Sequence, residues 1–199
     1  MRLFIPDVSG AKSIVICEAL RGVPGIELIG GDHRGYVRRL HSRHINRVVR
    51  YADPGQNPDA FIRDLQSICE RERIDRVFPV NSREYRLLLP HRASFNGRLD
   101  HLPTLEQFRR LDNKVDFSAL AATLQLPVPR HYRLEDDPVT FPLVFKPAES
   151  ASAKGVRYLH DRSELTRLRN TYSESDYVLQ EYIQGFGAGY SVMEIGRAH

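Results

Sequence analysis

Lysine is scarce in this chain, which has four lysines against 25 arginines. Three of the four, Lys114, Lys146 and Lys154, fall within one stretch of the second half. Because arginine is the default cation here, a retained lysine indicates a position where a compact, mobile ammonium serves better than a planar guanidinium, as on an oligophosphate. The scarcity of lysine therefore gives a first indication of a nucleotide site.

Long apolar runs and paired cysteines are also missing. No stretch approaches the roughly 18 uninterrupted apolar residues of a membrane helix, and the first residues lack the apolar block of a signal peptide. We therefore expect a cytoplasmic protein. Cys17 and Cys69 stand alone, without metal-site or redox spacing, and we interpret both as reduced core thiols. With 41% hydrophobic residues among 199, the chain can bury an ordinary core in one large domain or two small ones.

A basic block interleaved with aromatic residues is absent as well. The arginines are spread along the chain, with the densest basic region at residues 38–50. We interpret the pI near 9.2 as solvated surface and expect no nucleic-acid partner. The region 38–50 stays open as an anion-binding face.

The first half of the chain alternates between strand and helix patterns. A strand at 2–5 and a turn at 7–10 precede helical spacing over 11–20, which is the opening of an α/β unit. Further strands are expected at 25–29, 46–51 and 75–80, and helices at 59–73 and 81–89. This alternation predicts a parallel sheet with helices packed over it.

Two polar segments of this half follow expected strand ends. They are Asp-Val-Ser-Gly at 7–10 and Asn-Ser-Arg-Glu at 81–84. Open α/β sheets bind ligands at the carboxyl ends of their strands, so both segments are candidates for shaping an acceptor-substrate pocket.

The pattern changes after a boundary near residue 110. Helical spacing over 108–124, in one or two helices, stops at the proline-containing segment 125–129. A strand at 141–147, a small-residue loop at 149–155, a second strand, a helix at 163–169 and a strand at 177–183 follow. We therefore expect an α/β domain at 1–110 and an α+β domain at 111–193.

Five short motifs of the second half occur in a telling order and spacing. They are Leu-Asp-Asn-Lys at 111–114, Leu-Pro-Val-Pro at 126–129, Phe-Lys-Pro at 145–147, Lys-Gly-Val at 154–156 and Gln-Glu-Tyr-Ile-Gln-Gly at 180–185. Each alone is weak, but together, over about seventy residues, they resemble the ATP-grasp superfamily. The resemblance makes 1–110 the domain that precedes the grasp and 111–193 the N-terminal part of the ATP-grasp domain.

The resemblance implies a ligase that activates a carboxylate with ATP as an acyl phosphate, which an amine then attacks. Phosphoryl transfer needs positioning and charge neutralisation, which suits lysine ammonium groups and loop hydroxyl and backbone donors. The implied ATP contacts are Lys114 and Lys146 at the phosphates, Ser150, Ser152, Lys154 and Gly155 in the covering loop, and Gln180, Glu181, Tyr182 and Ile183 in the adenine hinge. The hinge would offer the side-chain amide of Gln180 and backbone groups of Glu181 and Ile183 to the base.

Two features qualify the resemblance. The covering loop has alanines where the family commonly has glycines, and alanine resists the positive φ that glycine accepts. Residues 185–189 offer no carboxylate for the ribose. Within the superfamily, the leading domain, Lys146 and the segment 185–189 are most similar to carbamoyl-phosphate-synthase-like carboxylate–amine ligases, and the small-molecule acid and amine stay unassigned.

The family's Mg²⁺ ligands lie on strands beyond the adenine hinge, and we expect them, with the second half of the grasp, to be missing from these 199 residues. The last six residues, 194–199, are what a common sequencing adapter would encode, so we expect a non-native tail there. Under this interpretation the chain is a fragment that binds ATP weakly at best and does not turn over.

Simpler interpretations stay open for individual residues and for the whole chain. Lys146 fits a snorkelling surface lysine at a strand end. Lys114 fits a helix-capping residue or a partner of Asp112. The whole chain could be a non-catalytic nucleotide- or sugar-binding α/β protein or an arginine-rich nucleic-acid binder, and the latter predicts affinity that falls steeply with salt.

Overall fold

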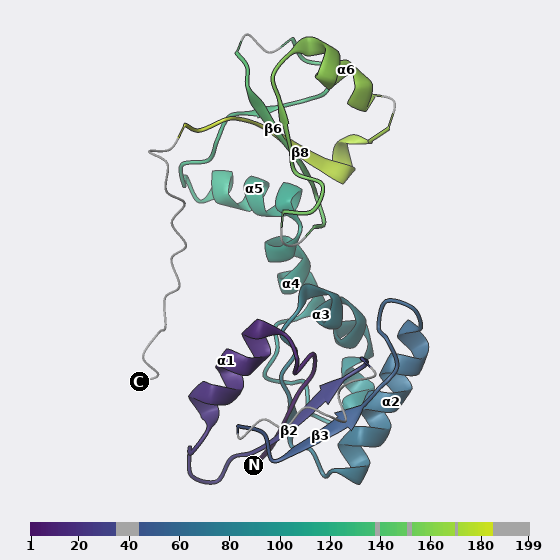
Figure 1. Ribbon diagram of the computed structural model, residues 1–199. Coiled ribbons are helices and arrows are strands. Elements are labelled where there is room, and N and C mark those ends of the chain that lie inside the picture. Colours follow the sequence, from purple (N-terminus) through teal and green to yellow (C-terminus); the bar gives the residue numbers. More distant parts are fainter. Residues whose placement is uncertain (35–43, 138–139, 151–152, 170, 185–199) are drawn as a thin grey trace. The chain divides into compact units, whose positions relative to one another are not determined.

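The computed structural model describes residues 1–34, 44–137, 140–150, 153–169 and 171–184. The chain forms two compact units, Met1–Arg110 and Leu111–His199, and each is described by itself. The first contains a parallel sheet and the second an antiparallel sheet (Figure 1). The expected fold class, a parallel α/β part followed by an α+β part, is confirmed. Ser152, the segment 185–193 and the expected tail at 194–199 lie outside the described residues.

The first unit has a four-stranded sheet in the order β3-β2-β1-β4. Its elements are β1 (Arg2–Ile5), α1 (Ala11–Leu20), β2 (Glu27–Asp32), β3 (Arg47–Arg50), α2 (Pro58–Arg71), β4 (Arg76–Val77), α3 (Ser82–Leu88), the 3₁₀ helix η2 (Leu89–Phe95) and α4 (Leu105–Asp112). Helix α2 begins at a side-chain cap, where Asn57 accepts from the Ala60 N–H at 3.0 Å. Both sequence and structure therefore place a βαβ-type unit here.

Two strands of the first unit differ in length from their expected ranges. β2 continues through Gly30 and Gly31 to Asp32, because its pairing with β3 extends to Asp32 although glycine weakens the strand signal of a sequence. β4 is only two residues long, and Pro79, two residues beyond it, has no N–H with which to extend the ladder.

Successive strand residues point to opposite faces of the sheet, so two separate cores form on it. On one face Leu3 and Ile5 of β1 pack with Cys17 of α1. On the other, Phe4 and the apolar side of α2 join α3 and η2 in the larger core. Figure 1 shows α1 and α2 on opposite sides of the strands. Both cysteines are buried and free, and burial raises the pKa of each thiol, so the interpretation as reduced core thiols is confirmed.

Gly31 is fixed by its neighbours in this core. A Cβ atom at this position would lie 2.8 Å from Cε2 of Phe4 and 2.9 Å from Cε1 of Tyr51, and both rings are buried. We expect Gly31→Ala to lower the free energy of unfolding by about 1–3 kcal/mol, because the rings have no free space into which to move. Chemical denaturation measures it. The matched control is Gly55→Ala, whose methyl group would press mainly on the end of the Arg83 side chain, and equal losses in the two variants would contradict the packing argument.

The second unit has a four-stranded sheet in the order β5-β8-β6-β7. Its elements are α5 (Lys114–Thr123), β5 (His131–Tyr132), β6 (Leu143–Pro147), β7 (Arg157–Leu159), α6 (Arg162–Arg169), the 3₁₀ helix η3 (Glu174–Asp176) and β8 (Tyr177–Glu181). The helical pattern over 108–124 divides at Asn113, whose side chain accepts from the N–H of Val115 at 2.9 Å and caps α5. β5 was not predicted, since two residues give no periodicity.

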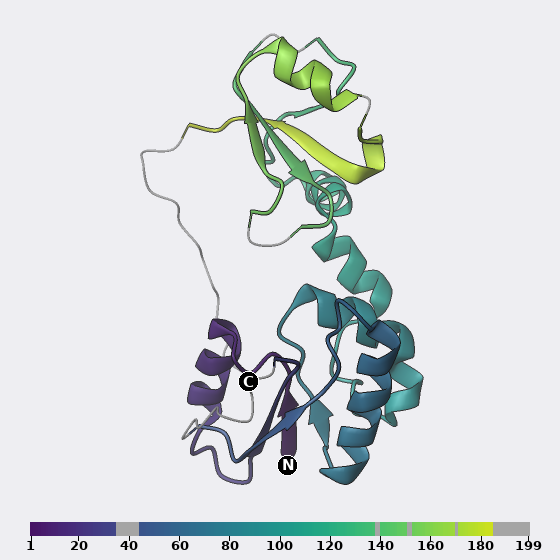
Figure 2. The ribbon, with the colours of Figure 1, turned by 45° about the vertical axis from the view of Figure 1, so that its right-hand side comes forward.

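The two faces of this second sheet have different roles. One carries Leu143, Phe145 and Leu179, which pack with Leu165 and Leu168 of α6. The opposite face carries the alternate residues of the same strands, among which are Lys146 of β6 and Gln180 of β8. Figure 2 shows α6 and α5 on opposite sides of β6 and β8. The alternation of the strands thus separates the core beneath α6 from a second face that carries the polar side chains of Lys146 and Gln180.

Candidate functional site

Lys146 lies on the face of the second sheet opposite α6, near the end of β6. Its Nζ atom donates a hydrogen bond of 2.9 Å to Oε1 of Gln180 on β8. Gln180 is only 6% exposed, and its Nε2 atom lies 2.8 Å from Nε2 of His131 on β5. The ammonium of Lys146 is therefore held over the sheet by a buried amide, which a snorkelling side chain would not need.

Lys114 ties the beginning of α5 to the loop that follows β6. Its Nζ atom donates to the carbonyl oxygen of Ser150 at 2.9 Å and to the Ser150 hydroxyl at 3.1 Å. Its backbone N–H donates to the carbonyl of Ala148 at 3.0 Å. The structure therefore brings two of the predicted residues, Lys114 and Ser150, into direct contact.

The described part of the covering loop uses two residues with positive φ. Gly155 has φ +76°, and a Cβ there would lie 2.7 Å from Cγ of Pro147. Ala153 has φ +57°, so the loop places an alanine in the region that alanine resists, at a cost of about 1 kcal/mol. Lys154 between them is exposed. The loop thus forms a tight turn although it has alanines where the family commonly has glycines. Ser152 lies outside the described residues.

The predicted hinge, residues 180–183, begins within the last two residues of β8 and continues beyond the strand. The carboxylate of Glu181 accepts from the Arg130 N–H at 2.8 Å, and the Glu181 N–H donates to the Arg130 carbonyl at 2.9 Å. The Tyr182 ring lies edge-on to Tyr158, with 5.8 Å between the centroids. Ile183 is 61% exposed. The Glu181 N–H is thus already bonded within the sheet, while Ile183 presents an apolar side chain at the surface.

His131 joins this site although the sequence gave no reason to select it. Burial and the nearby charge of Lys146 lower its pKa. Its contact with Gln180 spans 49 residues of sequence and depends on the register in which His131 lies opposite Gln180. A single-residue shift of that register would turn His131 to the other face, so no local signal could have found it.

A second polar cluster lies at the carboxyl edge of the first sheet, where the two predicted turns meet. The Asn81 side-chain amide donates to Asp7 Oδ2 at 2.7 Å, and the Asp7 N–H donates to the Tyr51 hydroxyl at 2.8 Å. Nη1 of Arg34 donates to Asp7 Oδ1 at 2.8 Å and lies 3.1 Å from Asp32 Oδ2. Segments 7–10 and 81–84 therefore share one polar edge, as expected for strand ends of a parallel sheet.

The buried carboxylates of this edge differ in their proton affinity. Burial alone would raise the pKa of Asp32, but hydrogen bonds from Ser9 and Arg34 outweigh it and lower the pKa. Glu84 is 3% exposed, and burial raises its pKa to about 7 even though its carboxylate accepts from the backbone N–H groups of Val80 and Asn81. Asp32 therefore stays ionised at neutral pH, while Glu84 is poised between its two states.

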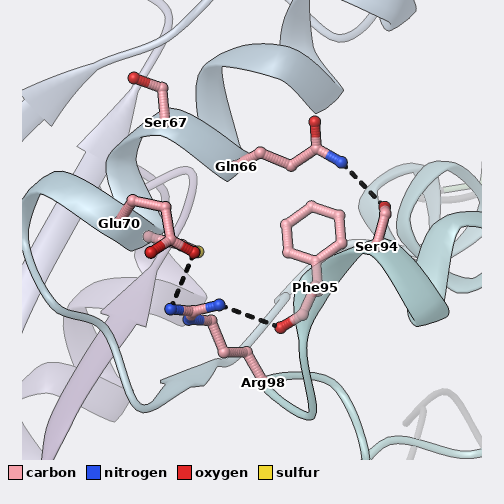
Figure 3. Close-up of a pocket in the computed structure, with 7 residues that line it drawn as sticks. Gln66, Ser67, Glu70, Ser94, Phe95 and Arg98 are labelled. Atoms are coloured by element: carbon pink, nitrogen blue, oxygen red, sulfur yellow. Dashed lines mark hydrogen bonds and ion pairs between the residues drawn. The ribbon is translucent and has the colours of Figure 1, made fainter.

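A small cavity of about 190 Å³ lies between α2 and the segment around η2 (Figure 3). Its polar groups satisfy one another, since Gln66 donates to Ser94 at 2.8 Å and Arg98 lies 3.0 Å from Glu70. Arg98 also donates to the backbone carbonyl of Ile74 at 2.9 Å. No predicted site residue lines this cavity, and we assign it a structural role.

The described residues contain no group of three or more histidine, cysteine, aspartate or glutamate side chains placed to hold a metal ion. These residues therefore do not fit a Mg²⁺ site, and the magnesium requirement stays a prediction.

Within the same described ranges, no helix has the length and apolar character needed to cross a membrane. The densest basic region was placed at 38–50, and its residues 38–43 lie outside the described part of the chain.

Comparison with known proteins finds similarities at low sequence identity. No protein-family model matches the chain. A curated relative, the 3-methyl-D-ornithine–L-lysine ligase of Methanosarcina mazei, is 24% identical over 172 residues, which is 79% of this chain and 43% of the relative. This chain therefore spans less than half the length of that ligase.

Solved structures share the fold at low sequence identity. The L-amino acid ligase from Bacillus licheniformis matches 92% of this chain and 44% of its own, with TM-score 0.63 and 15% identity. Biotin carboxylase from Campylobacter jejuni, solved with an ATP analogue, gives TM-score 0.63 at 13% identity, covering 92% of this chain and 45% of its own. N5-carboxyaminoimidazole synthetase from Staphylococcus aureus, solved with ADP, gives 0.62 at 11%, covering 92% and 47%. These structures share the fold of this chain at 11–15% identity, so the fold expected from the resemblance to the ATP-grasp superfamily is confirmed.

Proposed function

We propose that this chain carries the nucleotide-binding part of an ATP-dependent carboxylate–amine ligase. The observation that carries the proposal is the buried amide of Gln180, which holds the ammonium of Lys146 on the face of the sheet opposite α6. A lysine held in this way on a fold shared with nucleotide-bound ligases is suited to an oligophosphate. The site would consist of Lys114, Lys146, the loop with Ser150, Ser152, Lys154 and Gly155, and the hinge 180–183.

The reaction that we propose for the whole ligase has two steps. A carboxylate oxygen attacks the γ-phosphorus of ATP and ADP leaves, which gives an acyl phosphate. An amine then attacks the acyl carbon, forms the C–N bond and releases phosphate. The lysine ammonium groups described above would hold the negatively charged phosphate oxygens in place for the first step, which is mainly a positioning and electrostatic task.

The part played by the first unit is a finer proposal. We propose that it is the domain that precedes the grasp, with the polar edge around Asp7 and Asn81 facing the acceptor substrate. The carbamoyl-phosphate-synthase-like subtype, the small-molecule acid and amine, the Mg²⁺ requirement and the absence of turnover by these 199 residues also stay proposals.

ATP titration calorimetry on the 199-residue chain tests the proposed site. We expect saturable binding that becomes at least about tenfold weaker in Lys146→Met, because the variant loses a charge-assisted contact to phosphate. Lys12→Met is the matched control, since Lys12 is an exposed lysine of α1. Equal affinity in the Lys146 and Lys12 variants, or a folded chain that binds no ATP, would contradict the proposal.

The same samples discriminate the alternative functions. An arginine-rich nucleic-acid binder would bind DNA or RNA with an affinity that falls steeply as salt rises, whatever residue stands at position 146. A non-catalytic binding protein of the same fold would bind nucleotide in the same way as the ligase. Unlike the whole ligase proposed above, it would not release ADP faster when carboxylates and amines are supplied.

A further inference from the structure

Three side chains from three strands form a hydrogen-bonded series on the face of the second sheet opposite α6. His131 of β5 lies directly opposite Gln180 of β8, and Gln180 lies directly opposite Val144 of β6. Lys146, two residues further along β6, shares this face and reaches Gln180 diagonally. The series therefore runs from His131 through the buried amide of Gln180 to Lys146.

The amide of Gln180 has one acceptor oxygen and one donor nitrogen, and its neighbours fix its orientation. A lysine ammonium has only donors, so Oε1 of Gln180 must face Nζ of Lys146, at 2.9 Å. The donor Nε2 then faces Nε2 of His131, at 2.8 Å, and this ring nitrogen must act as an acceptor. The arrangement therefore requires a neutral His131 that carries its proton on Nδ1.

We propose that His131 is a positioning residue that holds Lys146 in place through Gln180, and that protonation of His131 releases Lys146. A charged imidazole would present an N–H to the amide nitrogen, so two donors would face each other. If the amide turned to offer its oxygen to His131, its nitrogen would face the ammonium of Lys146 instead. The single oxygen of Gln180 can thus accept a hydrogen bond from Lys146 or from protonated His131, but not from both. Acidification therefore releases Lys146. This inference rests on the proposed nucleotide role of Lys146.

The surroundings of His131 favour the neutral form at physiological pH. Burial and the positive charge of Lys146 lower its pKa, so the proton binds only at a more acidic pH than it does to a free histidine. His131 lines a cavity of about 280 Å³ next to α5, and from α5 the lining residue is the apolar Val115. The other charged or titratable groups around it are Tyr132, Arg133, Asp136, Glu174 and Tyr177 of the same cavity, together with Arg130 and Glu181 at the adjoining strand ends.

Charge within this surrounding group is largely balanced. The guanidinium of Arg133 lies 3.3 Å from the Glu174 carboxylate, and the backbone N–H of Arg133 donates to the Asp136 carboxylate at 2.9 Å. The Tyr177 hydroxyl accepts from the Leu134 N–H at 3.0 Å. These acidic groups therefore have partners of their own. Lys146 is the charged group that hydrogen bonds connect to His131 through a single side chain, that of Gln180.

Nuclear magnetic resonance on the nucleotide-free 199-residue chain tests the series directly. Between about pH 5 and about pH 8, we expect His131 to be the Nδ1–H tautomer at the alkaline end. The side-chain resonances of Lys146 and Gln180 should shift with the same midpoint as the His131 ring. In His131→Gln, which keeps an acceptor and cannot be protonated in this range, the shift at Lys146 should disappear. It should persist in His160→Gln, which removes an exposed histidine of the same unit.

Two results of this experiment would overturn the proposal. One is a Lys146 resonance that does not follow the titration of His131. The other is a neutral His131 that carries its proton on Nε2, since the amide could not then accept at both ends. Neither result depends on ATP binding, so the test stands even if the proposed function fails.

A second measurement connects the series to the nucleotide. On acidification through the titration of His131, we expect the ATP affinity of the wild-type chain to fall by up to roughly tenfold relative to His131→Gln. Protonation of ATP itself affects both proteins equally and cancels in the ratio. Parallel pH profiles of the two proteins would overturn the positioning role. A chain that binds no ATP would refute the proposed function, while the resonance experiment would still decide the switch.

Discussion

Replacing Phe145 by alanine is expected to lower the free energy of unfolding of the second unit by about 3–5 kcal/mol. Phe145 is fully buried in the central strand β6, and its ring packs against Tyr172 and Tyr177 at centroid distances of 4.9 and 5.4 Å. Truncation removes this apolar contact and leaves a cavity, which the strands paired on both sides of β6 cannot close. Chemical denaturation followed by amide hydrogen exchange on β6 and β8 measures the loss.

Phe117→Ala is the matched control for this prediction. Phe117 lies on α5 and is 48% exposed, so its truncation removes little buried surface. Comparable destabilisation by the two substitutions would contradict the assigned core. Because Phe145 precedes Lys146 on the same strand, Phe145→Ala should weaken ATP binding together with stability. Lys146→Met should weaken binding with a smaller loss of stability, which arises from the unpaired oxygen of Gln180.

The second large effect concerns the pH dependence of the first unit. Burial raises the pKa of Glu84 to about 7, from an ordinary value of 4.5. The folded state therefore binds the proton more tightly than the unfolded state. The resulting stabilisation is complete below about pH 4.5 and is lost as the pH rises through about 7, by about 3 kcal/mol in all.

Glu84→Gln should remove this pH-dependent part of the free energy of unfolding, because a neutral amide does not titrate. The amide still offers an oxygen to the N–H groups of Val80 and Asn81. The measurement is the difference in the free energy of unfolding between about pH 5 and about pH 8, compared between wild type and variant. Glu18→Gln, at an exposed position of α1, should keep the wild-type difference. An unchanged pH dependence in Glu84→Gln would show that Glu84 is ionised in the folded protein throughout this range.

The lengths of several elements could be predicted only in part. Helix α2 lies at Pro58–Arg71, close to the expected range 59–73. It could be predicted because its apolar residues recur at helical spacing and a capping asparagine precedes them. β5 was missed and β4 was overextended. Both are two-residue strands whose existence depends on a partner strand rather than on their own periodicity.

The sequence selected several residues of the candidate site but not the contacts that they make. The scarcity of lysine and the order of the motifs selected Lys114, Lys146 and Gln180, and the structure gives each of them a specific polar partner. The partners themselves, Ser150 for Lys114 and His131 for Gln180, are 36 and 49 residues away in sequence. Asp32 and Arg34 were not selected either, although an aspartate that ends an apolar strand is a signal that could have found the first.

The sequence by itself determined the class of each unit and the change of pattern near residue 110, and it predicted the residues suited to a polyphosphate. These properties depend on local periodicity, capping and composition, which adjacent residues specify together. Only the tertiary structure decided which side chains meet: the register of β5, β8 and β6 brings His131, Gln180 and Lys146 onto one face. Register is set by pairing between distant segments, and a shift of one residue would turn each side chain to the opposite face of the sheet.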